Sequence, residues 1–517
     1  PAHNSYIRDT PQLILPDVTR PVMDLFACET GALLACAAYL LEEEFNAVSP
    51  FILTCIEDNL KRRILLPYLT AHFWWMGHDD EPMCNWTVWC TQNVLLTTFL
   101  MPWSVEMSSR LSSPVRTFCG NAPLFLPENT SDTVVTLQAI LHKAAESCDY
   151  FLKDYGNDGC CEEGAQYYRH AGLCLYGAMT VLNTVTDGHF DTLFRWDKVK
   201  NIASYILNVH VNDKYYFNFA DCSPIAGRAG VREYLFGKAT GQEDLCLFAA
   251  KDFQAGQGQL VTDEVNGGNL FYRMQTVFHY EELMQQNTSG ILSHRDVYYP
   301  SVGLFLVHSD TLDLAVKAGD NADSHNHNDT GSITLYKNGL PILADIGVET
   351  YTRKTFSPRR YEIWTMQSGY HNLPTICGTD QKDGVEYRAE NVMTVLTGAE
   401  PSISMELAAA YPAAQSTVPD LTYVRRVTLK KSSNTVVLED HTNAQDVILN
   451  FITYEKPVIL SDGKLSIGEA SASFEGADLL AIETLPITDA RLKTAWDHDL
   501  YRIRLKGNDA GFRLTIQ

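Results

Sequence analysis

The segment 324–332 (SHNHNDTGS) gathers side chains that could carry out chemistry. It places His325 and His327 two positions apart, puts the carboxylate of Asp329 close behind, and leads into the strand-like run 333–336. Alternate residues of a strand point to one face, so both imidazoles could reach the same cavity. The spacing therefore predicts a functional cluster beside a sheet.

Two side chains further along complete a candidate metal site. Asp345 lies in the apolar run 342–347 (ILADIG), and His371 lies in the segment 368–373 (SGYHNL). Two histidines and one carboxylate brought together by strands are a suitable ligand set for a divalent cation. This set uses two of the three imidazoles and leaves one for catalysis.

The elements that must position these residues are predicted strands. From about residue 289, alternating or β-branched runs bounded by Gly, Asn and Asp recur. Lys337-Asn338-Gly339 between two runs indicates a hairpin. We interpret this half as antiparallel sheets stacked in a sandwich. The runs cover 302–307, 312–317, 332–336, 392–397, 423–429, 435–438 and 447–454.

The first half has helical patterns instead. Asp24 is a candidate N-cap, Ser49-Pro50 is typical of a helix start, and Gly156 of a helix end. Successive helices with intervening loops suggest paired helices arranged as a barrel or toroid. The patterns cover about 25–41, 50–68, 131–155, 163–184, 194–210, 242–253 and 270–286.

We therefore predict an α+β multidomain chain. An N-terminal (α/α) toroid over 1–288, an incomplete barrel of paired helices, precedes an antiparallel β-sandwich over 289–517, with a further division near 400–455 as an option. The Ser- and Pro-rich stretch 102–130 is predicted to be a long loop or insertion.

Length and charge narrow the class of protein. A chain of 517 residues exceeds one hydrophobic core. The net charge of −23, from 63 acidic and 40 basic residues, argues against nucleic acid as a partner. The sequence has no run of 18 uninterrupted apolar residues, so it predicts no membrane span. Thirteen cysteines are an odd number, which weakly favours a reducing or anaerobic setting.

The order of these elements resembles that of the heparinase II/III-like polysaccharide lyases. The resemblance covers about residues 24–454 and rests on the order and spacing of several motifs together. It implies a bacterial carbon–oxygen lyase, in a compartment that the sequence leaves open. The motifs are 85–90 (NWTVWC), 158–168 (DGCCEEGAQYY), 324–347 and 370–381 (YHNLPTICGTDQ).

Such lyases cleave a uronic-acid polymer by β-elimination, which needs carboxylate neutralisation, a base at C5 and an acid at the leaving oxygen. The resemblance assigns Asn85 to the carboxylate. It assigns Tyr167 as the acid, with the base as a further role, and His325 as base or carboxylate ligand. Tyr168 stays open as the alternative, because Ala165 stands where the family usually has proline. Without the resemblance, Asn85 is a loop or capping residue and one of the two tyrosines belongs to the core.

A second group of residues has expected substrate-binding roles. Glu163 could orient Tyr167 or a sugar hydroxyl, or could merely begin a helix. Aromatic rings could stack on sugars, although tryptophans in helical proteins are often core residues. The group is Glu163, Tyr168, Trp86, Trp89, Asn218 and Arg353.

The resemblance assigns His327, Asp345 and His371 to one structural divalent ion that ties two sheets together. Their donors suit Zn²⁺ first and Mn²⁺ second. The expected partner is an acidic polysaccharide or oligosaccharide, and a homodimer is an option for assembly.

Several functions compete at this stage. A glycosaminoglycan such as heparan sulfate, hyaluronan or chondroitin is the first expected substrate, and an alginate-type polyuronate is the alternative. A toroid glycoside hydrolase would need paired carboxylates, for which Glu162 or Glu163 with Asp221 are the candidates. A non-catalytic glycan-binding module would not need Asn85, Tyr167 and His325 together.

Overall fold

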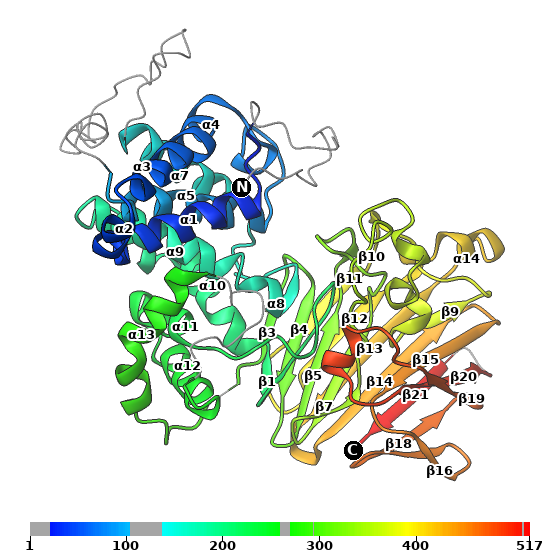
Figure 1. Ribbon diagram of the computed structural model, residues 1–517. Helices are drawn as coiled ribbons and strands as arrows, with labels where there is room; N and C mark the ends of the chain where they lie inside the picture. The colour runs from blue at the N-terminus through cyan, green and yellow to red at the C-terminus, as the bar shows by residue number, and fades with distance from the viewer. Residues whose placement is uncertain (1–20, 104–136, 259–268, 293, 509–510) are drawn as a thin grey trace. The chain divides into compact units, whose positions relative to one another are not determined.

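A computed structural model describes residues 21–103, 137–258, 269–292, 294–508 and 511–517 (Figure 1). The chain forms two compact units. The first comprises Pro1–Gly156, Arg169–Ala203 and Ala229–Thr288, and the second comprises Asn157–Tyr168, Ser204–Arg228 and Ser289–Gln517. Two segments that the sequence places in the helical domain, 157–168 and 204–228, therefore group with the sheets. Almost all of the predicted loop 102–130 lies outside the described residues.

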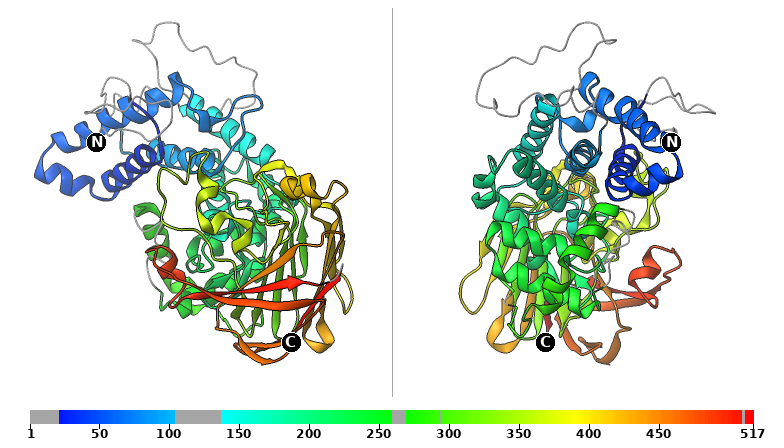
Figure 2. Two further views of the ribbon diagram at one scale, coloured as in Figure 1. Left: turned by 90° about the vertical axis from the view of Figure 1, so that its right-hand side faces the viewer. Right: turned by 60° about the vertical axis from the view of Figure 1, so that its left-hand side comes forward.

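Helices packed on one another build the first unit (Figure 2). α1 packs on α5, α5 packs on α7 and α9, and α11 packs on α12. Asp24 caps α1 as predicted, since its Oδ1 accepts a hydrogen bond from the backbone nitrogen of Ala27 at 2.9 Å. The helices are α1 (Leu25–Leu40), α2 (Glu42–Val48), α3 (Phe51–Leu60), α4 (Leu66–Thr70), α5 (Asn85–Leu100), α7 (Leu137–Asp154), α9 (Gly172–Val185), α11 (Val231–Thr240), α12 (Glu243–Ala255) and α13 (Leu270–Gln285). α10 (Asp197–Asn208) runs from this unit into the second.

Among the described helices, none is by itself long and apolar enough to cross a membrane. α1 and α2 pass that test of length and composition only as a pair, and an 85° bend separates them. Every cysteine in the described part of the chain is a free thiol.

Two large sheets whose neighbouring strands run antiparallel form the second unit (Figure 1). One has the order β19-β20-β15-β8-β7-β5-β4-β3, with β9 also pairing with β15, and the other has the order β11-β12-β13-β14-β21-β18-β17-β16. The first contains β3 (Val297–Tyr299), β4 (Leu304–His308), β5 (Leu312–Lys317), β7 (Ile333–Lys337), β8 (Leu340–Leu343), β9 (Pro374–Ile376), β15 (Val447–Thr453), β19 (Ala477–Leu485) and β20 (Leu500–Gly507). The second contains β11 (Glu390–Val395), β12 (Ser402–Glu406), β13 (Tyr423–Lys430), β14 (Thr435–Thr442), β16 (Val458–Ser461), β17 (Lys464–Ile467), β18 (Ala470–Glu475) and β21 (Gly511–Ile516).

Smaller elements complete this unit. β1 pairs with β2 and β6 pairs with β10, each as a two-stranded ladder. These elements are α8 (Gly164–Tyr168), α14 (Pro412–Thr417), α15 (Leu492–Ala495), β1 (His210–Asn212), β2 (Tyr215–Tyr216), β6 (Asp320–Asn321) and β10 (Gly384–Arg388).

Alternating side chains explain why these segments pack as sheets. In β13, Tyr423, Arg425 and Val427 are buried, whereas Val424 and Arg426 are exposed. Buried side chains from both sheets share one hydrophobic core, which is the arrangement of a sandwich.

The predicted hairpin at 337–339 is confirmed between β7 and β8. Asn338 has φ 51° and Gly339 has φ 77°, and such left-handed conformations at both central residues are typical of a tight hairpin turn.

A buried ion pair fastens the histidine-bearing loops to the second sheet. The Arg425 side chain donates from Nε to Asp440 Oδ1 at 2.9 Å and from Nη2 to Oδ2 at 2.7 Å. Its Nη1 donates to the carbonyl oxygens of Gly331 at 2.9 Å and Asn372 at 2.8 Å. Because Gly331 ends the histidine-rich loop and Asn372 follows His371, this one guanidinium holds both loops.

Replacing Arg425 by Met should lower the free energy of unfolding by about 3–5 kcal/mol, because Asp440 would remain as a buried, unpaired charge. The control is Arg426→Met on the exposed face of the same strand. This variant should change the free energy of unfolding by less than about 0.5 kcal/mol. Urea unfolding measures both variants. Equal midpoints would contradict the role given to Arg425.

Candidate active site and metal centre

The histidine-rich segment is a loop, not a strand. Residues 322–332 lie between β6 and β7 without strand structure. His325 has φ 59°, a left-handed conformation that is uncommon outside glycine. The expectation that strand alternation aims His325 and His327 at one face was therefore wrong. A shared carboxylate brings the two rings together instead.

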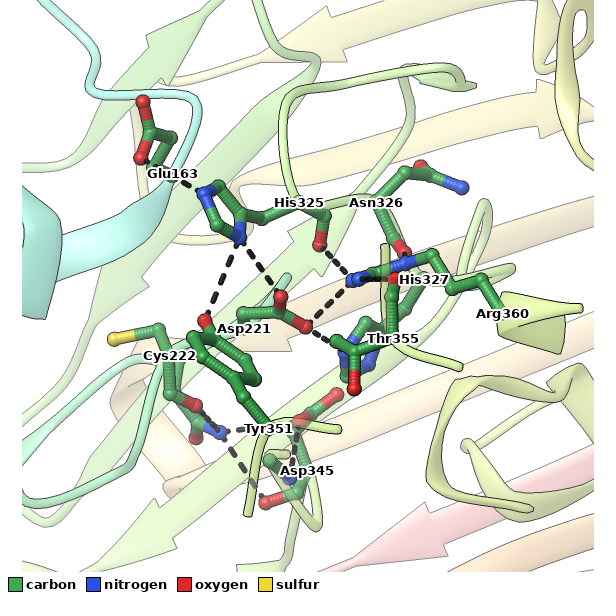
Figure 3. A network of polar contacts seen from close by, with 12 residues as sticks. Glu163, Asp221, Cys222, His325, Asn326, His327, Asp345, Tyr351, Thr355 and Arg360 are labelled. Atoms are coloured by element: carbon green, nitrogen blue, oxygen red, sulfur yellow. Dashed lines mark hydrogen bonds and ion pairs between the residues drawn. The ribbon is translucent and has the colours of Figure 1, made fainter. Parts of the chain in front are cut away.

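That carboxylate is Asp221, whose side chain is fully buried (Figure 3). Its Oδ2 lies 2.8 Å from His325 Nδ1, and its Oδ1 lies 3.1 Å from His327 Nε2. Arg360 Nη2 donates to Oδ1 at 2.5 Å. Burial alone would favour the protonated acid. The hydrogen bonds from both histidines and the charge of Arg360 outweigh burial and hold the pKa of Asp221 well below its usual range.

Arg360 also fixes the backbone of the loop. Its Nη2 donates to the His325 carbonyl at 2.8 Å and its Nε to the Asn326 carbonyl at 2.9 Å. The structure uses this arginine to hold Asp221 and the conformation of His325.

Glu163 lies on the other side of the His325 ring (Figure 3). Its Oε2 is 3.5 Å from His325 Nε2. Burial alone favours the neutral imidazole, but the hydrogen bond with Asp221 and the charge of Glu163 outweigh it and raise the pKa of His325. The ring therefore favours its cationic, hydrogen-donating form.

A close backbone approach sets the start of the helix that carries Tyr167. Gly164 begins α8 with φ +82°, and a Cβ there would lie 2.6 Å from the Cβ of Cys222, so only glycine fits. The predicted continuous helical pattern 163–184 is interrupted at 169–171, between α8 and α9. In α8, Tyr168 is fully buried against Tyr205, whereas Tyr167 lies at the His325 ring.

Two phenols meet beside this imidazole. The Tyr167 and Tyr351 hydroxyl oxygens are 2.6 Å apart, and the Tyr351 oxygen is 3.4 Å from His325 Nδ1. The Tyr167 ring stacks on the His325 ring with centroids 4.8 Å apart. Burial raises the pKa of Tyr167, while the hydrogen bond with Tyr351 and the charge of Arg491 oppose it. Burial and the neighbouring Tyr167 raise the pKa of Tyr351.

Sequence reasoning did not find Tyr351. It singled out Arg353, which lies two positions later and is exposed. The available signal was weak: an aromatic residue in an irregular segment shortly after the candidate ligand Asp345.

Two further carboxylates, Asp323 and Asp329, belong to the histidine-rich loop and are paired with one lysine. Lys317 Nζ is 2.6 Å from Asp323 Oδ2 and 3.4 Å from Asp329 Oδ1. Burial raises the pKa of Glu162 to about 7, and the charges of Asp323 and Glu163 add to the shift. Glu162 is therefore a carboxyl that folding favours in its protonated form.

Glu162→Gln should make the protein more stable than wild type at neutral and alkaline pH but not at acidic pH. Because the folded pKa lies above the usual 4.5, wild type loses stability as pH rises from about 4.5 to about 7. The variant should gain about 1–2 kcal/mol at pH ~8 and about nothing at pH ~4. Thermal unfolding across pH measures this difference, with Glu400→Gln, an exposed change, as control. A difference that does not vary with pH would contradict it.

His327, Asp345 and His371 converge at a buried centre. One ligand atom from each lies within 4.8 Å of the others. His371 Nδ1 is 2.9 Å from Asp345 Oδ2, and the Asn218 amide donates to Asp345 Oδ1 at 3.0 Å. His327 Nδ1 and His371 Nε2 are buried without a hydrogen-bond partner among the described residues. Two such imidazole nitrogens and one carboxylate fit a divalent cation.

The remaining predicted residues have other surroundings. Asn85 is the first residue of α5, is 5% exposed and belongs to the first unit. In the same unit, the Trp86 ring lies 5.2 Å from that of Trp74. Trp89 Nε1 donates to Glu29 Oε1 at 2.8 Å. These residues stay candidate substrate contacts.

Residues 293–447 match the family described as heparinase II/III-like, C-terminal. The matched region contains His325, the predicted metal ligands and Tyr351. A comparison with curated proteins gives no sequence match.

The fold as a whole is similar to solved polysaccharide lyases. A heparinase III gene product is 13% identical, with a TM-score of 0.59 over 95% of this chain and 67% of that chain. The heparan sulfate lyase HepC from Pedobacter heparinus is 11% identical, with a TM-score of 0.52 over 90% of this chain and 63% of that chain. The Streptomyces coelicolor A3 chondroitin AC lyase, in complex with chondroitin sulphate, is 9% identical, with a TM-score of 0.52 over 95% and 74%. The predicted class, a helical toroid followed by an antiparallel sandwich, is confirmed.

Proposed function

We propose that the chain is a polysaccharide lyase that cleaves a uronic-acid-containing polymer by β-elimination. The observation that carries the proposal is the close set formed by Tyr167, Tyr351 and His325, with the two phenol oxygens 2.6 Å apart. Elimination needs a base for the C5 proton, an acid for the leaving oxygen and positive charge beside the carboxylate. This set offers all three.

In this mechanism the phenols exchange protons and His325 supplies charge. The phenolate of the pair takes the C5 proton, the C–H electrons form the C4–C5 double bond, and the C4–O bond breaks. The departing oxygen takes a proton from Tyr167. The imidazolium of His325, held between Asp221 and Glu163, stabilises the developing negative charge. Asn85 is the proposed second donor to the carboxylate.

A glycosaminoglycan is the proposed substrate class, with an alginate-type polyuronate as the alternative. The names of the similar structures, heparan sulfate lyase and chondroitin AC lyase, support the first. A glycoside hydrolase is less well supported. Asp221, which it would need as a catalytic carboxylate, is fully buried and already bonded to His325, His327 and Arg360.

We also propose one structural divalent ion, Zn²⁺ before Mn²⁺, at His327, Asp345 and His371. Bound there, it would supply cross-linking of loops rather than a reacting group. Because His327 contacts Asp221, the ion would also stabilise the position of the carboxylate that holds His325.

The lyase activity can be tested with heparan sulfate, hyaluronan, chondroitin sulfate and alginate. Wild type should form the ultraviolet-absorbing unsaturated uronate from at least one of them. Tyr167→Phe should lower the rate by about 10²–10⁴, because it removes the acid. Tyr168→Phe, which changes a buried neighbour, is the matched comparison and should retain more activity.

Two results would contradict these assignments. Reducing ends without the unsaturated product would indicate a hydrolase. Full activity of Tyr167→Phe together with inactive Tyr168→Phe would transfer the role to Tyr168.

His327→Ala should lose the bound metal and lower the melting temperature, because folding and metal binding are coupled. Asn85→Ala, remote from the ligand set in sequence, should keep the metal. Elemental analysis and thermal unfolding measure both. Equal metal content in wild type and His327→Ala would rule out the metal assignment.

A further inference from the structure

Arg491 lies beside the phenols of Tyr167 and Tyr351 and comes from a segment that follows the region matched by the family. It precedes α15 in the connection between β19 and β20, whereas the matched region ends at residue 447. Its guanidinium carbon lies 4.5 Å from the centroid of the Tyr351 ring. Its Nη2 donates to the carbonyl oxygen of Asp221 at 3.1 Å.

The connection that carries Arg491 is fastened to the segment that carries Tyr351. Asp489 Oδ1 accepts hydrogen bonds from the backbone nitrogens of Thr350 at 3.0 Å and Arg491 at 2.8 Å. The buried Trp496 donates from Nε1 to the Ile346 carbonyl at 2.9 Å. These contacts fix the guanidinium relative to the phenol.

Arg491 forms no salt bridge with a carboxylate in the described part of the chain. The Asp221 carboxylate attracts its charge, but that carboxylate is already paired with Arg360. Arg491 is half-buried, and a cation withdrawn from water without a counter-ion is unfavourable. A negative charge on the adjacent phenols would supply the missing counter-ion.

We propose that Arg491 is a positioning residue that stabilises the single negative charge of the Tyr167–Tyr351 pair. This rests on the proposed elimination, in which the pair must lose one proton to act as base. Arg491 is well placed because its guanidinium lies over the Tyr351 ring and is fixed there by the contacts of its own connection.

Several charges compete at the pair. Burial raises the pKa of both phenols; Asp221 raises it for both, and Glu163 also for Tyr167. His325 faces both rings, and the charge of Arg491 lowers both pKa values. Removing Arg491 therefore raises the pKa of the pair, so that the reactive phenolate forms only at higher pH.

The kinetic test compares Arg491→Gln with Arg491→Lys in the full chain. Loss of the guanidinium beside the Tyr351 ring should raise the pKa of the phenol pair by about 1–2 units. Arg491→Gln should therefore lower kcat about 10–100-fold at neutral pH. Its rising pH limb should move to higher pH by the same amount. Arg491→Lys retains the charge and should recover to within about tenfold of wild type. Lys493→Gln, an exposed change two residues away, should match wild type.

A second measurement needs no substrate. The ultraviolet band of tyrosinate is followed against pH in wild type, Tyr351→Phe, Arg491→Gln and the double variant. The step that depends on Tyr351 should move to higher pH when Arg491 is replaced. If it does not move, the proposal is overturned, even if wild type cleaves none of the polymers and the proposed function fails separately. A rise in KM with an unchanged pH limb would also overturn it, because Arg491 would then bind substrate.

Discussion

The site depends on one buried carboxylate with three donors. Asp221 binds the candidate catalytic imidazole of His325, a ring of the candidate metal centre in His327, and the Arg360 guanidinium. A fully buried charge is tolerated only when its lone pairs are occupied, so each partner is needed for the others to be in place. Asp221 comes from residues 204–228, which fold with the sheets although they lie between helical segments in the sequence.

The same arrangement gives neighbouring groups opposite tendencies. Asp221 and Glu163 flank His325 and favour the imidazolium, whereas burial raises the pKa of the two phenols beside it. The roles proposed for His325 and for the phenol pair thus depend on their surroundings rather than on unusual residue types. Because the site is assembled from distant segments, the surroundings of His325 and those of the phenols come from different parts of the chain.

The sequence predicted what depends on local chemistry. The Asp24 cap, the 337–339 hairpin and the alternation in β13 each depend on short patterns. His327, Asp345 and His371 come from three separate segments that the fold brings together, and their role as metal ligands stays a prediction. Features that depend on long-range contacts were not predictable in this way. The left-handed backbone of His325 exists because Arg360 and Asp221 hold it. Tyr351 and Arg491 carry no recognisable motif, and only the fold brings them to Tyr167.

The order of strands has a consequence for biosynthesis. β15 lies between β8 and β20 in one sheet, and β21 lies between β14 and β18 in the other. Both sheets therefore stay open along an inner position until residues 500–516 have left the ribosome. A nascent chain ending at residue 447 would hold all three candidate metal ligands but would expose unpaired strand edges, which are sites of aggregation. Closure of both sheets therefore waits for β20 and β21, the last two strands along the described chain.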